Sequence, residues 1–380
     1  MSLEGVRSTI LVYLGTRALL LVVAWIDGAT RHHKFTHELA NWDGLWYRML
    51  AHHGYPVHVL HVPTTLGFFP LFPIVIWAAG HFFLMTSAHS FLWSITVTGI
   101  IVSGIGGLVA AVLMHRLAAG WWGEERGRRA AWFFCLFPGS VVFSMAYAEG
   151  LMIPLAAGCI LALERRRWLL AGLLAGLATA TEPEGVVLVL VCAVSALVEL
   201  RRGGWRDRQA RRSMLAPLLS LTGVVSFASF LWAWTGTPFA SLLAQRYAWH
   251  EKTDPFALIH LAKSLAAEIS FSHFNHPTIN LNLVIGVAGA LFLIAMLVLL
   301  FRVRRTVSIE ALVWTLGISF LAMTSEFTPP NPRLIITAFP AVLVVGYYLK
   351  GRTFSWVQLL NGGLLAGLSA LTFIGSTLRP

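Results

Sequence analysis

Long apolar runs recur from one end of the chain to the other, separated by short segments rich in Arg, Glu, Pro and Gly. A helix that crosses the hydrocarbon core of a bilayer needs about 20 apolar residues, and somewhat fewer where it is short or buried in protein. One further apolar segment, 67–86, fits either a span or a shorter element. The pattern predicts membrane-spanning helices over residues 8–26, 91–115, 130–147, 150–164, 168–181, 185–200, 213–234, 279–301, 307–325, 334–349 and 354–376.

The basic residues decide how segment 67–86 is interpreted. Cytoplasmic loops of membrane proteins carry an excess of Lys and Arg. If 67–86 does not cross the membrane, most of the 28 Lys and Arg residues lie on the side of the N-terminus, including those at 165–167 and 201–212. If it does cross, every later cluster changes side and the bias is reversed. We therefore expect an interfacial or re-entrant element, with Pro70 and Pro73 breaking a regular helix near its start.

The expected fold is all-α and polytopic, with about eleven transmembrane helices in a single membrane-embedded domain over residues 1–380. The N-terminus is expected in the cytoplasm and the C-terminus outside. Two long external loops are expected, at 28–90 and 236–278, with interfacial helices in the first. Small residues four apart predict close helix–helix contacts at Ser103/Gly107, Gly172/Gly176 and Gly363/Gly367.

The composition supports a membrane protein and argues against other classes. The chain is 57% hydrophobic and 12% charged, more apolar than a soluble protein can bury. The net charge of +11 sits in short clusters between apolar runs, whereas nucleic-acid-binding proteins gather such charge on one continuous face, so no nucleic acid is expected as a partner. Cys135, Cys159 and Cys192 lie inside apolar runs, as packing residues do.

The stretch "NWDGLWYRMLAHHGYP" at 41–56 carries Asp43, one of only four aspartates in the chain. Asp43 and Tyr47 are four residues apart and share one shoulder of a predicted interfacial helix, with Gly54 as its C-terminal cap. The alternative is that Asp43 is the N-cap of this helix. Its tryptophan-rich face, expected to rest on lipid, consists of Trp42, Leu45, Trp46, Met49, Leu50 and His53.

Five segments in order resemble blocks of a known family. They are "WDGLWYRMLAHHGYP" at 42–56, "FFPLFP" at 68–73, "LFPGSVVFSMAYAEGL" at 136–151, "QRYAW" at 245–249 and "PRLIITAFP" at 332–340. Together they resemble the PIG-V mannosyltransferases and their bacterial relatives. More broadly, the chain is similar to the GT-C superfamily of polytopic glycosyltransferases, which use polyprenyl-phosphate sugars.

The resemblance implies a catalytic carboxylate in the first external loop, which falls on Asp43. It also implies that 67–86 is a juxtamembrane part of that loop. Two departures stand out: the chain has Thr181-Glu182-Pro183-Glu184-Gly185 where the family has T-R-x-x-G, and Tyr147-Ala148-Glu149-Gly150 where the family has Y-S-E-S.

The implied chemistry needs a base and a cation. A carboxylate would take the proton of an attacking hydroxyl, and a cation would stabilise the departing phosphate. The candidate base is Asp43. The candidate donor-phosphate contacts are Arg333, Arg246 and Arg17, and the candidate substrate contacts are Trp42, Trp46, Tyr47, Glu149, Gln245 and Trp249.

Each of these charged residues also has a structural alternative. Arg333 could be an interfacial arginine, Arg17 a helix-packing residue, and Glu149, Glu182 and Glu184 acids that favour a helix start. Seven of the 14 histidines crowd the first external loop between His32 and His61, but no H-E-x-x-H or comparable ligand spacing occurs, so neither a metal nor another cofactor is expected.

The leading hypothesis is an inverting mannosyltransferase that uses a polyprenyl-phosphate-mannose donor at the extracytoplasmic face of a bacterial plasma membrane. The acceptor is left open between a glycolipid, a glycan and a protein. One alternative keeps the fold and uses another lipid-linked sugar, such as arabinose. The other is a lipid or sugar-lipid transporter, against which the lack of internal repeats argues.

Overall fold

The computed structural model describes residues 3–32, 35–59, 61–84, 91–269, 280–373 and 378. These residues are helical almost throughout and form no strand beyond one isolated bridge between Thr253 and Ser325. Six helical segments within them are long and apolar enough to cross a membrane, which confirms an all-α polytopic fold. They are α1 (Leu3–Arg31), α5 (Phe91–Trp122), Pro183–Gly203, Arg208–Thr235, α15 (Leu281–Arg302) and α20 (Gly351–Phe373).

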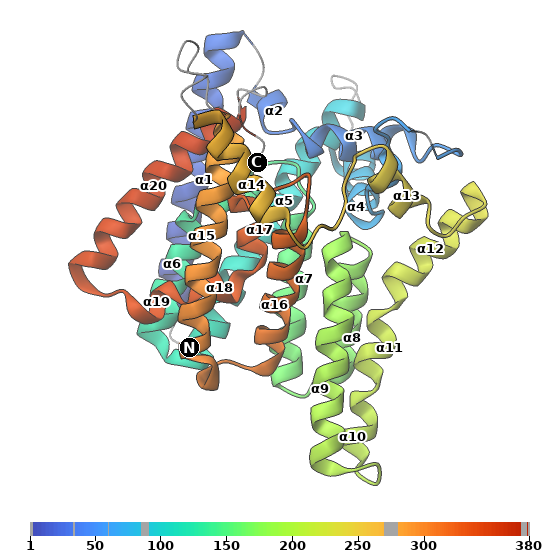
Figure 1. Cartoon of the computed structure of the whole chain (residues 1–380), viewed down its shortest axis with the longest axis vertical. Coiled ribbons are helices and arrows are strands. Elements are labelled where there is room, and N and C mark those ends of the chain that lie inside the picture. The colour runs from blue at the N-terminus through green and yellow to red at the C-terminus, as the bar shows by residue number, and fades with distance from the viewer. Residues whose placement is uncertain are drawn as a thin grey trace.

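Shorter helices fill the rest of the bundle (Figure 1). Pro183–Gly203 contains η4 (Pro183–Val186) and α9 (Val187–Gly203), and Arg208–Thr235 contains α10 (Arg208–Ser213), α11 (Leu215–Ser220) and α12 (Thr222–Thr235). The others are α6 (Glu124–Leu136), α7 (Glu149–Glu164), α8 (Trp168–Thr179), η6 (Arg304–Thr306), α16 (Ile309–Thr324), α17 (Pro332–Thr337), α18 (Phe339–Leu343) and α19 (Val345–Tyr348). Since length alone does not assign these as spans, the count of about eleven stays a prediction.

One predicted span is wrong in its second half. The helix expected over 130–147 ends at Leu136, and a 3₁₀ helix, η3 (Pro138–Ser144), follows at 110° to α7. Pro138 cannot donate a backbone hydrogen bond, and it holds Phe137 before it in an extended conformation. This bend brings Tyr147 and Glu149 to the end of the bundle where α7 begins.

That end of the bundle, the upper end in Figure 1, is capped by short elements. They are α2 (Phe35–Glu38), α3 (Asp43–His53), η1 (Thr65–Gly67), α4 (Leu71–Ala79), η2 (Gly80–Leu84), α13 (Ala240–Tyr247) and α14 (Ala257–Ile269). Pro70 is the N-cap of α4 and Pro73 lies in its first turn, so this helix begins where the prolines predict. The interfacial placement of 67–86 stays a prediction.

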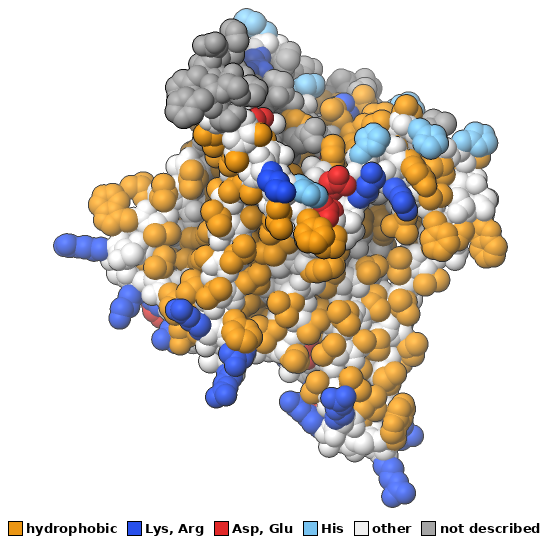
Figure 2. Space-filling view, viewed as in Figure 1, with side chains coloured by type: hydrophobic (Ala, Val, Ile, Leu, Met, Phe, Trp, Pro, Cys, Tyr) orange, Lys and Arg blue, Asp and Glu red, His pale blue; other side chains and the backbone are white. Residues whose placement is uncertain are grey.

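Charge and apolar surface separate along the bundle axis. Figure 2 shows a broad apolar belt around the middle, with many Lys and Arg side chains below it, and histidines, acidic side chains and a few further Lys and Arg side chains above it. The arginine-rich connections α7–α8, α9–α10 and α15–α16 all lie at the lower end (Figure 1). In the same view α1 begins at the lower end and α20 ends at the upper one. This arrangement agrees with the asymmetry expected from the positive-inside rule.

Close helix contacts depend on glycine at two of the three predicted pairs. A Cβ on Gly107 would lie 2.4 Å from the Tyr13 hydroxyl, and a Cβ on Gly176 would lie 2.7 Å from the Leu219 carbonyl oxygen. The third predicted pair is wrong as a packing contact. A Cβ on Gly363 or Gly367 would meet no described atom within 4 Å outside the backbone of its own helix. Both glycines lie on an open face of α20.

These glycines generate a matched pair of substitutions. We expect Gly176→Ala to lower the unfolding temperature of the purified protein in detergent, since overpacking a close contact costs about 1–3 kcal/mol. Gly367→Ala meets open space and gains helix propensity worth roughly 0.5–1 kcal/mol, so its unfolding temperature should stay or rise. Equal unfolding temperatures for the two variants would contradict the packing described here.

Candidate active site

The side chain of Arg333 joins three segments at the upper end of the bundle. Its Nη1 lies 2.5 Å from Oδ2 of Asp43 at the start of α3, and its Nε donates to Oε1 of Glu149 at the start of α7. Its guanidinium carbon also lies 4.7 Å from the ring centroid of Tyr147. The side chain is mostly buried, at 19% exposure, so this ion-paired arrangement determines where both carboxylates lie.

Local sequence explains why Arg333 points into this cluster. The preceding "TPPNP" segment prevents helix, and α17 starts at Pro332, which suits the first helical position. Asn331 caps the helix, its Oδ1 accepting from the backbone N–H of Leu334 at 3.0 Å. Because the start of α17 is fixed in this way, the position of Arg333, the second residue of the helix, is fixed as well.

Tyr147 is the site residue that the sequence interpretation missed. Its buried hydroxyl accepts a hydrogen bond from the backbone N–H of Asp43 at 3.3 Å. Ser103 of α5 fixes its backbone twice, donating to the Tyr147 carbonyl at 2.7 Å and accepting from its N–H at 3.1 Å. A signal was available, because Tyr147 lies in the "AYAEG" stretch that supplied Glu149.

Asp43 is not the helix cap that the alternative interpretation required. The N-cap of α3 is Trp42, and Asp43 is the first helical residue, with no side-chain capping hydrogen bond at this end. Only Oδ2 is engaged by Arg333; Oδ1 has no hydrogen-bond partner among the described residues. The Asp43 side chain is 27% exposed, so it is not sealed inside the protein.

Glu182 is a third carboxyl group of the cluster. It is buried in the turn between α8 and η4 and is electrostatically coupled to Glu149. Burial, and then the negative charge of Glu149, raise the pKa of Glu182 well above its ordinary value. Oε2 of Glu149 is buried without a hydrogen-bond partner in the described part of the chain, and a protonated Glu182 would supply one. Glu184 lies in η4, which follows this turn, and is half-buried.

The tryptophan-rich face of α3 is partly covered by protein, which corrects the sequence prediction at Trp46, while Met49 is 44% exposed and His53 is exposed. Trp46 stacks on Phe68, with 6.0 Å between ring centroids, and meets Trp249 edge-on at 4.9 Å. Tyr47 is buried and packs edge-on against Phe68 and Phe72. Trp46 is covered because Phe68, in the loop after α3, and Trp249, after α13, pack against it.

Gln245 and Trp249 hold together the two loops that the sequence predicts to be external. Gln245 Nε2 donates to the Gly67 carbonyl at 2.9 Å, and Trp249 Nε1 donates to the Thr64 carbonyl at 3.4 Å. Further along the same loop, the carboxylate of Glu251 accepts from the hydroxyls of Ser325 and Thr328, which precede Arg333. The second loop thus positions the aromatic pair Trp46 and Trp249, and also the segment that precedes Arg333.

The other two candidate arginines are not brought to this cluster by any contact. Arg17 is buried and donates to the Ser140 carbonyl and to the hydroxyls of Ser140, Ser144 and Thr16. Arg246 is exposed and lies over the ring of Tyr247 at 5.7 Å. No group of three or more His, Cys, Asp or Glu residues in the described ranges has an arrangement that could hold a metal ion, and His33 lies outside those ranges.

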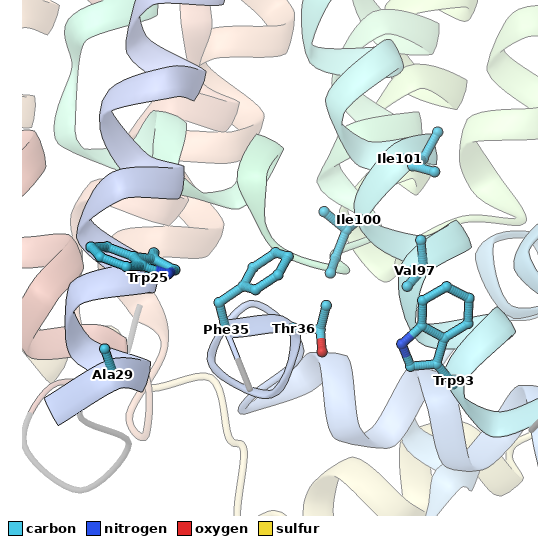
Figure 3. Close-up of a pocket in the computed structure, with 8 residues that line it drawn as sticks. All are labelled: Trp25, Ala29, Phe35, Thr36, Trp93, Val97, Ile100 and Ile101. Carbon is cyan, nitrogen blue, oxygen red and sulfur yellow. The ribbon is translucent and has the colours of Figure 1, made fainter. Parts of the chain in front are cut away.

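An apolar hollow of about 430 Å³ opens beside the loop that carries Asp43 (Figure 3). Trp25 of α1, Phe35 of α2 and Trp93 of α5 line it, together with smaller side chains. Its α2 wall is tied to the cluster, because the carbonyl of Leu39 accepts from the N–H of Ala146, next to Tyr147. Hydrocarbon is the ligand chemistry that such a lining suits.

The fold is similar to the folds of two proteins of known structure. It is similar to the oligosaccharyltransferase of Archaeoglobus fulgidus, with a TM-score of 0.51 and 13% identity, over 93% of this chain and 56% of that one. It is also similar to ArnT of Cupriavidus metallidurans bound to undecaprenyl phosphate, with a TM-score of 0.51 and 17% identity, over 93% and 63%.

The family follows from the sequence profile described as Mannosyltransferase (PIG-V), which matches residues 21–241. Because this match covers more than half of the chain, the protein belongs to the PIG-V mannosyltransferase family. A curated relative is GPI alpha-1,6-mannosyltransferase 2 of Cricetulus griseus, 30% identical over 157 residues, which is 40% of this chain and 30% of the relative. The chain therefore matches about a third of the length of that relative.

The raised pKa of Glu182 generates a prediction on stability. Since the folded protein holds this proton more tightly than the unfolded chain, the wild-type protein should lose stability as the pH rises above the unfolded value of about 4.3. Gln cannot ionise, so Glu182→Gln should unfold at a higher temperature than wild type at pH 8 and at a similar temperature at pH 4.5. The exposed Glu326→Gln serves as control and should show no such pH-dependent gain. A Glu182→Gln variant that is less stable at pH 8 than at pH 4.5, relative to wild type, would contradict the prediction.

Proposed function

We propose that the protein transfers mannose from a polyprenyl-phosphate-mannose donor to an acceptor hydroxyl, with inversion at the anomeric carbon. The observation that carries this proposal is the cluster in which Arg333 holds Asp43 and Glu149 at one end of the bundle. Membership of the PIG-V mannosyltransferase family supports the sugar, and the undecaprenyl phosphate bound to ArnT supports a lipid phosphate as the carrier.

Asp43 would act as the general base. The proton of the acceptor hydroxyl passes to the unengaged Oδ1, while the acceptor oxygen forms a bond to the anomeric carbon. The bond from that carbon to the phosphate oxygen breaks, and its electron pair leaves with the polyprenyl phosphate. Because attack and departure occur on opposite faces, a β-linked donor yields an α-mannoside. The phosphodiester is already a good leaving group, so no general acid is needed.

Arg333 would serve both the base and the phosphate. Two of its nitrogens are engaged by Asp43 and Glu149, and Nη2 has no partner among the described residues. Nη2 would donate to a phosphate oxygen on which negative charge accumulates as the sugar departs. The exposed Arg246 is the second candidate for this role, while Arg17 would act only through the residues of η3 that it holds.

The remaining candidates would shape the substrate site. Trp46 and Trp249 form an aromatic wall near Asp43, and Gln245 fixes the loop behind that wall. Trp42 donates from its indole N–H to the Thr372 carbonyl at 3.1 Å and so anchors the start of α3 to α20. The apolar hollow between α1, α2 and α5 would take hydrocarbon of a lipid-linked substrate.

The proposed base can be tested by transfer assays with purified protein and synthetic polyprenyl-phosphate-mannose. We expect Asp43→Asn to lower kcat by about 10²–10⁴-fold, because a missing general base costs that much. The matched control is Asp207→Asn at the N-cap of α10, at the other end of the bundle, which should keep its activity. Wild-type activity in a folded Asp43→Asn protein would remove Asp43 as the base.

We further propose that this end of the bundle faces the exterior of a bacterial plasma membrane. The support is the gathering of arginine-rich connections at the opposite end (Figure 1).

Cysteine labelling of intact cells tests this orientation. The three native cysteines are buried and should stay unlabelled. We expect a membrane-impermeant maleimide to label Lys252→Cys in the second external loop, and to label Arg202→Cys at the end of α9 only after lysis; both wild-type positions are exposed. The reverse pattern would place the site in the cytoplasm.

A further inference from the structure

A groove of about 560 Å³ runs along three helices, α5, α7 and α8, away from the candidate active site. Its walls are almost wholly apolar, and it is open to the surroundings, since Ile105 and Val109 of α5 are 60% and 47% exposed. The groove exists because the helices carry glycine there. A Cβ on Gly106 would lie 1.7 Å from the Gly150 carbonyl oxygen, so this residue sets the close approach of α5 and α7, and Gly158 leaves the floor without a side chain.

Three arginines line one end of the groove: Arg116 of α5, Arg165 directly after α7 and Arg167 directly before α8. On α5 the lining side chains Val109, Leu113 and Arg116 follow helical spacing. On α7 they run to Leu161 and Arg165, and the turn into α8 adds Arg167. This is the lower end of the bundle, where basic residues gather and where the positive-inside rule places the cytoplasm (Figures 1 and 2).

The three guanidinium groups are available to an anion. No ion pair within the described ranges involves Arg116, Arg165 or Arg167, and all three are exposed. The neighbouring Arg166 is different, because it pairs with Glu199 at 3.4 Å. The acid next to Arg165 in the sequence is Glu164. Its carboxylate attracts Arg165 electrostatically, but Oε1 accepts a hydrogen bond from the indole N–H of Trp121 at 2.8 Å.

The dimensions of the groove suit a lipid. From Leu151 to Arg165 the α7 wall is about 20 Å long at 1.5 Å per residue, which is about two thirds of a hydrocarbon core of about 30 Å. Anionic phospholipids are concentrated in the cytoplasmic leaflet, where they attract basic side chains. We propose that the groove binds an anionic phospholipid, with an acyl chain along α5 and α7 and the phosphate against Arg116, Arg165 and Arg167.

Binding can be measured by native mass spectrometry on delipidated full-length protein titrated with phosphatidylglycerol or phosphatidylcholine of the same acyl chains. We expect phosphatidylglycerol to bind at least tenfold more tightly. The triple variant Arg116→Gln/Arg165→Gln/Arg167→Gln should lose this preference. Ile105→Trp, which places bulk in the open groove, should weaken the binding of both lipids at least threefold.

A second triple variant, Arg201→Gln/Arg202→Gln/Arg206→Gln, is the matched control. It removes the same charge from the same end of the bundle but from exposed residues outside the groove, so it should keep the preference for phosphatidylglycerol. Size-exclusion chromatography checks that all variants fold. Equal affinity for the two lipids, equal losses in the two triple variants, or full competition by glycerol phosphate without acyl chains would each overturn the proposal.

Discussion

A single guanidinium group shared between two carboxylates holds the candidate active site together. Arg333 reaches Asp43 and Glu149, which are far apart in sequence and begin different helices. Removing one partner of a buried ion pair costs about 3–5 kcal/mol, because the other charge is left uncompensated. The starts of α3, α7 and α17 are therefore coupled. The ion pairs form only if the starts of these three helices lie next to one another. The bend after Leu136, at Pro138, brings the start of α7 to this position, and the Asn331 cap fixes the start of α17.

Much of the fold was predictable because its causes are local. The apolar runs locate most helices within a few residues, and the prolines at 70 and 73 locate the start of α4. The basic clusters predict which ends of the helices share a side. Asp43, Glu149 and Arg333 were predictable as candidates because charged groups are rare in so apolar a chain. Their direct pairing was not, since no periodicity relates residues 43, 149 and 333.

The errors come from interactions between distant segments. The spacing of the tryptophans in α3 is that of a lipid-facing helix, but Trp46 is covered because the loop that carries Gln245 and Trp249 packs onto the loop after α3. The helix predicted over 130–147 was interrupted by one proline within an otherwise apolar run. The pair Gly363/Gly367 has the spacing of a packing motif but faces no neighbour among the described residues. The sequence could not predict this, because the spacing of small residues does not show which helix, if any, lies opposite them.

The link between the two external loops has a consequence for how such sites diverge. Gln245 and Trp249 bind carbonyl groups of Gly67 and Thr64, so the anchor points on the first loop are backbone atoms. Gly67 has little freedom, since a Cβ there would lie 3.0 Å from Gln245 Nε2. At Thr64 the side chain caps η1, because its hydroxyl accepts from the Leu66 N–H at 3.4 Å, so another capping residue such as Ser or Asp would leave the accepting carbonyl in place. The first loop can therefore change other side chains while keeping its attachment to the second.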